Sequence, residues 1–134
     1  MLLIFNIHRI FGEMLLPLLI VAVAIYMTVV YKSGAAHGPV ARLFPMLVDL
    51  QVGLGIIYWL SLLSVGLTTK YLGFPFILHP IIGLIASGLA HLAVGTKNPL
   101  SALGRWTPLA SLAVLLILVM STITVAMITR GMPV

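Results

Sequence analysis

Residues 76–95 read FILHPIIGLIASGLAHLAVG. This apolar run is long enough to cross a bilayer, because about 20 helical residues span the hydrocarbon core. It carries His79 near its start and His91 near its end. A histidine inside a membrane span is costly unless it has a partner or a function. The rest of the chain is therefore expected to surround this helix and to satisfy its two imidazoles.

The composition is that of a membrane protein. The chain has 134 residues, of which 62% are hydrophobic and 7% are charged, and its mean hydropathy is +1.26. A soluble domain of this length needs a more highly charged surface. The net charge of +5 does not indicate nucleic-acid binding, because the basic residues fall at the ends of apolar runs, where they anchor helices. The absence of cysteine excludes disulfides, iron–sulfur clusters and thiolate metal sites.

Four apolar segments of this kind divide the chain, at about residues 10–31, 43–63, 75–95 and 107–129. Each segment must be helical in lipid, where every backbone amide needs an internal partner. Short connections rich in Gly, Pro and Ser join them, which makes neighbouring helices antiparallel. The sequence therefore predicts an all-α integral membrane protein, a four-transmembrane-helix up-down bundle forming one domain, residues 1–134, with both termini on the same side.

The orientation of this bundle is weakly encoded. The apolar N-terminus lacks a basic leader, so the first span is expected to act as its own insertion signal. The positive-inside rule compares basic residues near the helix ends on the two faces. One face carries four, Lys32, Arg42, Lys97 and Arg105, and the other carries three, Arg9, Lys70 and Arg130. This difference favours both termini outside.

Polar residues in the first two spans suggest local features. Glu13 follows Arg9 by four residues, a spacing that stacks two side chains on one helical face, so a neutralising pair is expected. Pro17 removes the amide that would bond the Glu13 carbonyl, which predicts a kink. In the second span, Gly53 and Gly55 are expected to let a neighbouring helix or a flat ligand approach closely.

His8 and His79 form the constellation best suited to a cofactor. In an up-down bundle the first and third spans start on the same face, so the two imidazoles should lie at similar depth. Imidazoles on facing helices commonly hold haem iron in both axial positions. His91 cannot join His79 on one haem, because twelve residues separate them by about 18 Å along the helix axis. A haem held by His8 and His79 as the two axial ligands of its iron is therefore geometrically possible.

Small residues follow His79 at helical spacing. Gly83, Ala86 and Ala90 lie on one face of the third span. Two interpretations remain open with equal weight. The stripe serves close helix packing, as small residues do in membranes, or Gly83 and Ala86 provide clearance for the face of a porphyrin.

A second polar group is expected on the opposite face of the membrane, formed by Asp49, Gln51 and His91. An Asp–His hydrogen bond would satisfy both side chains and need have no other role. The alternatives are a proton-handling site, a pocket for a quinone headgroup, or a second metal site. His37, in the first connection, could join His91 on a second haem, although a histidine between Gly and Pro is more typical of a solvated turn.

The fourth span has the pattern of a scaffold helix. Between Arg105 and Arg130 it has no charged residue and offers only hydroxyl groups, those of Ser111, Ser121, Thr122 and Thr124. Elsewhere the chain contains no glycine-rich phosphate loop, paired-carboxylate set, zinc-ligand spacing or serine nucleophile elbow. The sequence thus favours an electron-transfer protein or complex subunit over a stand-alone enzyme, and no nucleic-acid partner is expected.

The first three spans resemble a group of small bacterial four-helix membrane proteins often labelled cytochrome B-like. The resemblance rests on His8-Arg9, the triplet Asp49-Leu50-Gln51 followed by Gly53, and the pattern HP-x₁₀-H from His79 to His91. It implies haem b, electron transfer and a bacterial cytoplasmic membrane.

Two positions depart from the group's pattern. Ile10 and Phe11 stand where a tryptophan is typical, and Leu78 replaces a glutamate before His79. A proton role that depends on that glutamate is therefore not carried over to this chain.

Three functions follow in order of preference. The first is a membrane-embedded b-type cytochrome that passes electrons, with quinone as a possible reactant, inside a larger redox complex or a homo-oligomer. The second is a cofactor-free accessory subunit of a respiratory or photosynthetic complex, in which the histidines are hydrogen-bond partners. The third is a small proton-coupled transporter using Glu13, Asp49 and His91 as relay groups, which the lack of an inverted repeat disfavours.

Overall fold

A computed structural model describes residues 2–32, 38–130 and 132. The prediction of an all-helical chain is confirmed, since the described residues contain helices and turns but no strand. The first long helical segment begins well before residue 10, where the sequence pattern placed its start. It comprises α1 (Leu2–Ile10), a π-helical turn η1 (Phe11–Leu15) and α2 (Leu16–Val29).

The π-helical turn η1 lies where a break was expected. Pro17 has no N–H to donate, so the carbonyl of Glu13 loses its usual partner four residues on. The residue before this proline, Leu16, donates its N–H to the carbonyl of Phe11, five residues back. The proline irregularity thus takes the form of one widened turn, which lies beside the cavity described below.

The remaining helices are α3 (Gly38–Ser64), the short α4 (Thr68–Leu72), α5 (Leu78–Val94), a 3-10 turn η2 (Ser101–Trp106) and α6 (Thr107–Arg130). The apolar pattern predicted a start of α3 at residue 43, but its first turn extends back to Gly38, with Pro39 in a position that needs no amide partner. In α5, Pro80 likewise occupies the first turn.

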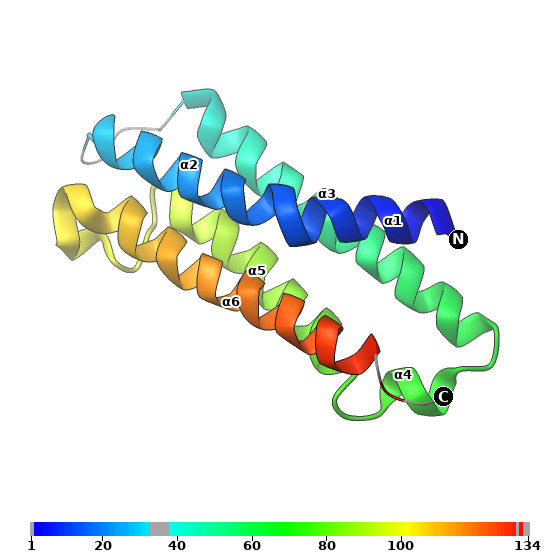
Figure 1. The fold of residues 1–134 in the computed structure, drawn as a ribbon. Coiled ribbons are helices and arrows are strands. Elements are labelled where there is room, and N and C mark those ends of the chain that lie inside the picture. The colour runs from blue at the N-terminus through cyan, green and yellow to red at the C-terminus, as the bar shows by residue number, and fades with distance from the viewer. Residues whose placement is uncertain (1, 33–37, 131, 133–134) are drawn as a thin grey trace.

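The long helical segments pack against one another in one bundle (Figure 1). α5 packs against both α3 and α6, α2 packs against α6, and α1 packs against α3. The core between them is apolar, and its largest fully buried side chains are Ile20, Met27, Phe44, Val48, Leu112 and Leu115. Figure 1 shows the start of α1 and the red end of α6 at the same end of the bundle, together with α4.

Within the described residues, three helical segments are long and apolar enough to cross a membrane: Leu2–Val29, Gly38–Ser64 and Ser101–Arg130. α5 is apolar but has only 17 residues. Large apolar side chains on the outside of the bundle are more than half exposed, among them Leu18, Ile25, Leu50, Leu84 and Ile117. An apolar surface of this extent is what lipid requires and water penalises, so the fold is compatible with a multi-pass membrane protein.

A buried amide holds the turn between α5 and α6. Asn98 donates from Nδ2 to the Ala93 carbonyl (3.0 Å) and to the Ser111 hydroxyl (2.8 Å). Its Oδ1 accepts from the Leu100 amide at 2.8 Å. One side chain therefore satisfies polar groups from both helices and from the turn between them.

Asn98→Ala is expected to lower the free energy of unfolding by about 1–3 kcal/mol, because it leaves buried polar groups without partners. Thermal unfolding in detergent, followed by circular dichroism, measures the change. Ser121→Ala is the matched control, since among the described residues the Ser121 hydroxyl bonds only the carbonyl of Ile117 in its own helix. Equal stability of the two variants would contradict the role given to Asn98.

Candidate functional site

A cavity of about 330 Å³ opens between α1, α3, α5 and α6, at the end of the bundle where α4 lies. Its lining includes His8 and His79, together with Gly55, Gly83 and Ala86. Four residues that the sequence linked to a cofactor, His8, His79, Gly83 and Ala86, thus lie around one space. Ala90, the third member of the small-residue stripe, is instead fully buried in the core.

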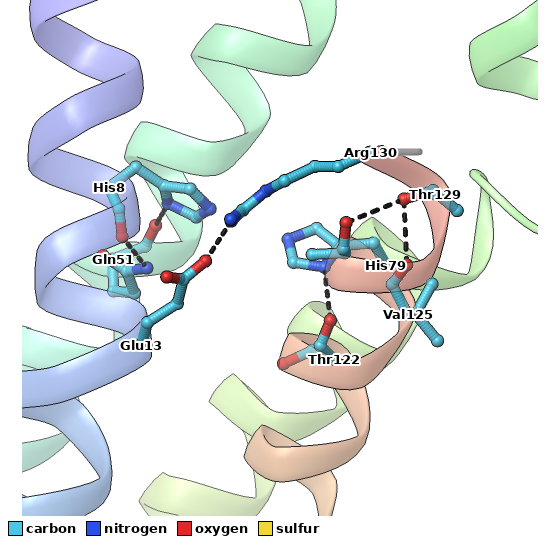
Figure 2. A network of polar contacts seen from close by, with 9 residues as sticks. His8, Glu13, Gln51, His79, Thr122, Val125, Thr129 and Arg130 are labelled. Atoms are coloured by element: carbon cyan, nitrogen blue, oxygen red, sulfur yellow. Dashed lines mark hydrogen bonds and ion pairs between the residues drawn. The ribbon is translucent and has the colours of Figure 1, made fainter. Parts of the chain in front are cut away.

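His8 is fixed to α3 by a reciprocal pair of hydrogen bonds, drawn in Figure 2. Its Nδ1 lies 3.0 Å from the carbonyl oxygen of Gln51, and Gln51 Nε2 donates to the His8 carbonyl at 2.8 Å. A carbonyl oxygen can only accept, so Nδ1 carries a proton and donates it. Nε2 of His8 is left with its lone pair available.

His79 is held in the same manner from the other side. Its Nδ1 donates to the Thr122 carbonyl of α6 at 3.0 Å. Among the described residues, no hydrogen-bond partner lies at Nε2 of either histidine. Figure 2 shows both free nitrogens directed toward the space between the two rings. The sequence pattern of α6 indicated a scaffold, yet one of its backbone carbonyls orients a ring of the site.

The two rings lie edge to face at a separation suited to a shared metal atom. Their centroids are 5.9 Å apart and their planes are inclined by 81°. An imidazole nitrogen binds a metal at about 2 Å, and the ring centre lies about 1 Å behind it, so one metal atom separates two ring centres by about 6 Å. Metal-ligating histidines also usually donate their other N–H to a carbonyl or carboxylate. The positions and the orienting bonds of His8 and His79 would therefore suit two ligands of one metal atom.

Two glycines leave room for the contacts between His8 and Gln51. A Cβ on Gly55 would lie 2.6 Å from Cε1 of His8 and 3.2 Å from both ring nitrogens. A Cβ on Gly12 would collide with the side-chain amide of Gln51. A Cβ on Gly53, which the sequence pattern grouped with Gly55, would meet nothing within 4 Å. Close approach is thus required at Gly55 and Gly12 and is not required at Gly53.

Gln51 belongs to this cavity and not to the group expected with Asp49 and His91. It is 7% exposed and its side chain bonds His8. Residues two positions apart on a helix point about 200° apart, so Asp49 and Gln51 cannot share a face of α3. Oε1 of Gln51 is buried and has no hydrogen-bond partner among the described residues. It is therefore an unused acceptor beside the cavity.

Glu13 does not pair with Arg9. Its carboxylate forms an ion pair with Arg130 from the end of α6, and Figure 2 shows the Arg130 side chain crossing the space beside both histidines. Arg9 instead lies over the ring of Phe5, with Cζ 5.7 Å from the centroid. Spacing along one helix could not reveal the pair, because its members are 117 residues apart.

Asp49 and His91 meet on the outer surface of α3 and α5. His91 Nε2 lies 2.8 Å from Asp49 Oδ2, and the Ser87 hydroxyl donates to Asp49 Oδ1 at 2.6 Å. The side chains of His91 and Asp49 are 55% and 44% exposed. This outer cluster of Asp49, Ser87 and His91 faces away from the cavity, and no sequence pattern pointed to Ser87 as a member. His37, the suggested partner of His91, lies outside the described residues.

No family model, curated protein or solved structure matches this chain. The resemblance to cytochrome B-like proteins, and the roles that it implies, stay predictions. In the part of the chain that the structure describes, no group of three or more His, Asp or Glu side chains is placed to hold a metal ion. A site with two imidazoles is sufficient for haem, whose iron takes only its axial ligands from the protein.

Proposed function

We propose that the chain is a membrane-embedded b-type cytochrome, in which His8 and His79 hold the iron of one haem b. The observation that carries the proposal is the arrangement of these two rings. Their centroids lie 5.9 Å apart, and each Nδ1 is tied to a backbone carbonyl. A packing role for the histidines would not require both Nε2 atoms to face one another without a partner.

The protein's contribution to such a site is binding and orientation. Bound haem supplies reversible one-electron chemistry at its iron. Gln51 and Thr122 fix the tautomer and the direction of the two imidazoles, and Gly55 leaves room for His8. The apolar lining, which includes Ala86 and Val119, limits access of water and so influences the reduction potential.

The proposal includes four membrane spans in an up-down bundle. α5, with 17 residues, extends about 26 Å at about 1.5 Å per residue, slightly less than a hydrocarbon core of about 30 Å. Its apolar flanking residues 75–77 can make up the difference. In this topology α1 and α5 start on one face, the termini share that face, and the host is a bacterial cytoplasmic membrane.

The test is the absorption spectrum of protein purified after haem-replete expression. We expect a reduced-minus-oxidised spectrum of six-coordinate haem b, and a pyridine haemochrome assay that gives one haem per chain. A colourless protein that also fails to bind added haemin would reject the proposal.

A second function, that of a subunit in a larger membrane complex, is favoured by the outer cluster. Asp49 and His91 are exposed on a surface that is otherwise apolar, with side-chain exposures of 44% and 55%. Polar groups that face lipid are costly, so a polar partner helix or a quinone headgroup would stabilise them. This role is compatible with haem binding, because the outer cluster and the cavity use different faces of α3.

Asp49→Asn is expected to release a partner subunit while the haem content stays unchanged. The substitution removes the charge that bonds His91 and Ser87. Gentle purification from native membranes, followed by native gel electrophoresis, measures the association. Thr124→Val is the control, because within the described part of the chain the exposed Thr124 hydroxyl bonds only the Met120 carbonyl of its own helix. Identical complexes from wild-type and Asp49→Asn protein would exclude the outer cluster as a subunit contact.

A further inference from the structure

The cavity carries an excess of positive charge at one end. Of the described residues that line it, Arg9, Lys70 and Arg130 are cationic at neutral pH and Glu13 is the one carboxylate. Two positive charges are therefore left without a carboxylate partner. Arg9 and Arg130 are exposed and Lys70 is partly buried, so this excess of positive charge lies where an anionic ligand can reach it.

Each of the three cations lies over an aromatic ring, Phe5 for Arg9 and Arg130 and Phe76 for Lys70. Arg9 and Arg130 both approach Phe5, with Cζ 5.7 Å and 5.9 Å from its ring centroid. Lys70 Nζ lies 5.0 Å from the ring centroid of Phe76 and donates to the Met132 carbonyl at 3.2 Å. Aromatic faces and carbonyls stabilise a cation only in part, and neither Arg9 nor Lys70 has a carboxylate partner among the described residues.

We propose that this cationic end of the cavity, formed by Arg9, Lys70 and Arg130, binds the two carboxylates of a dianionic porphyrin. The inference rests on the proposed haem site and adds the part of the ligand that the histidines do not hold. Two carboxylates balance the two uncompensated charges. Arginine is suited to the task because its guanidinium forms charge-assisted, often bidentate bonds with carboxylates.

Arg130 has a particular part in this arrangement. Its ion pair with Glu13 draws the side chain across the space beside His8 and His79 (Figure 2). Entry of the ligand requires Arg130 to exchange Glu13 for a ligand carboxylate. Glu13 is then a competitor for the same cation, so its removal should strengthen binding while removal of Arg9 or Lys70 should weaken it.

The experiment compares haemin with haemin dimethyl ester, in which both carboxylates are blocked. Purified apoprotein in neutral detergent is titrated with each compound. Absorbance reports ligation, and quenching of Trp59, which lines the cavity, reports occupancy. We expect the ester to bind at least about tenfold more weakly than haemin, the factor expected when charge-assisted hydrogen bonds are lost.

Variants assign the effect to residues. Arg9→Gln and Lys70→Gln should each reduce the preference for haemin over its ester by several-fold, roughly the factor given by one lost charge-assisted bond, and Glu13→Gln should increase it. Lys97→Gln is the control, because Lys97 does not line the cavity and should leave the ratio unchanged.

Two outcomes would overturn the inference in distinguishable ways. Equal affinity of wild-type protein for haemin and the ester, with a six-coordinate spectrum in both, would refute the cationic end and leave the haem site standing. Failure of both compounds to give that spectrum would refute the haem site and the inference together. The assignment to Arg9 and Lys70 would also be overturned if Lys97→Gln reduced the preference for haemin as much as Arg9→Gln does. The preference would then reflect the overall charge of the protein.

Discussion

His8→Ala and His79→Ala are each expected to abolish the six-coordinate haem spectrum and to lower haem affinity by more than about a hundredfold. Even outer-shell partners of metal ligands change metal affinity by about 10–100-fold, and these substitutions remove the ligating nitrogen itself. Spectra of the reduced variants and titration with haemin measure the two effects. Each truncation also leaves a space next to the iron position, so added imidazole should restore the spectrum in part.

His91→Ala provides the control for these variants. It lies on the same helix as His79, but its ring bonds Asp49 on the outer surface and does not line the cavity. We expect wild-type haem content and spectrum from this variant. A six-coordinate spectrum that survives in His8→Ala but is lost in His91→Ala would show that the wrong pair of histidines has been assigned.

The proximity of His8 and His79 is the part of the site that could be predicted from the sequence. Apolar runs separated by short connections indicate the approximate helix positions, and antiparallel neighbours then place the starts of the first and third helices at one end. No contact had to be known for this step, because it uses only the alternation of helix direction. The helix ends were harder to predict from the sequence, since α1 extends back to Leu2 and α3 begins at Gly38.

The other components of the site depend on packing that local patterns do not encode. Thr122 orients His79 through its backbone carbonyl, a group that every residue has, so its side chain offered no signal. Arg130 has the sequence position of an interfacial anchor, and its reach to Glu13 is a tertiary contact. Gln51 is different, because helical geometry alone places it about 200° from Asp49. Applying that angle to the second span is enough to separate Gln51 from the outer cluster.

Gly55→Ala is expected to reduce haem affinity by about 10–100-fold, the range for loss of a partner that orients a metal ligand. The new methyl group would lie 2.6 Å from Cε1 of His8, so the ring must move. Its Nδ1 is bonded to the Gln51 carbonyl at 3.0 Å, and movement away from α3 stretches that bond and redirects Nε2. Haemin titration measures the affinity, and the spectrum reports whether the second ligand is still bound.

Gly53→Ala separates this effect from a general effect of alanine in α3. A Cβ there meets nothing within 4 Å, and Gly53 does not line the cavity. Alanine is favoured over glycine inside a helix by about 1 kcal/mol, so Gly53→Ala should unfold at an equal or higher temperature and bind haem as the wild type does. If Gly55→Ala also bound haem normally, His8 would have to reach the iron without its bond to Gln51. The orienting role given to the Gln51 carbonyl would then be wrong. Equal losses of haem affinity in both variants would instead indicate a general effect of alanine on α3, unrelated to the space beside His8.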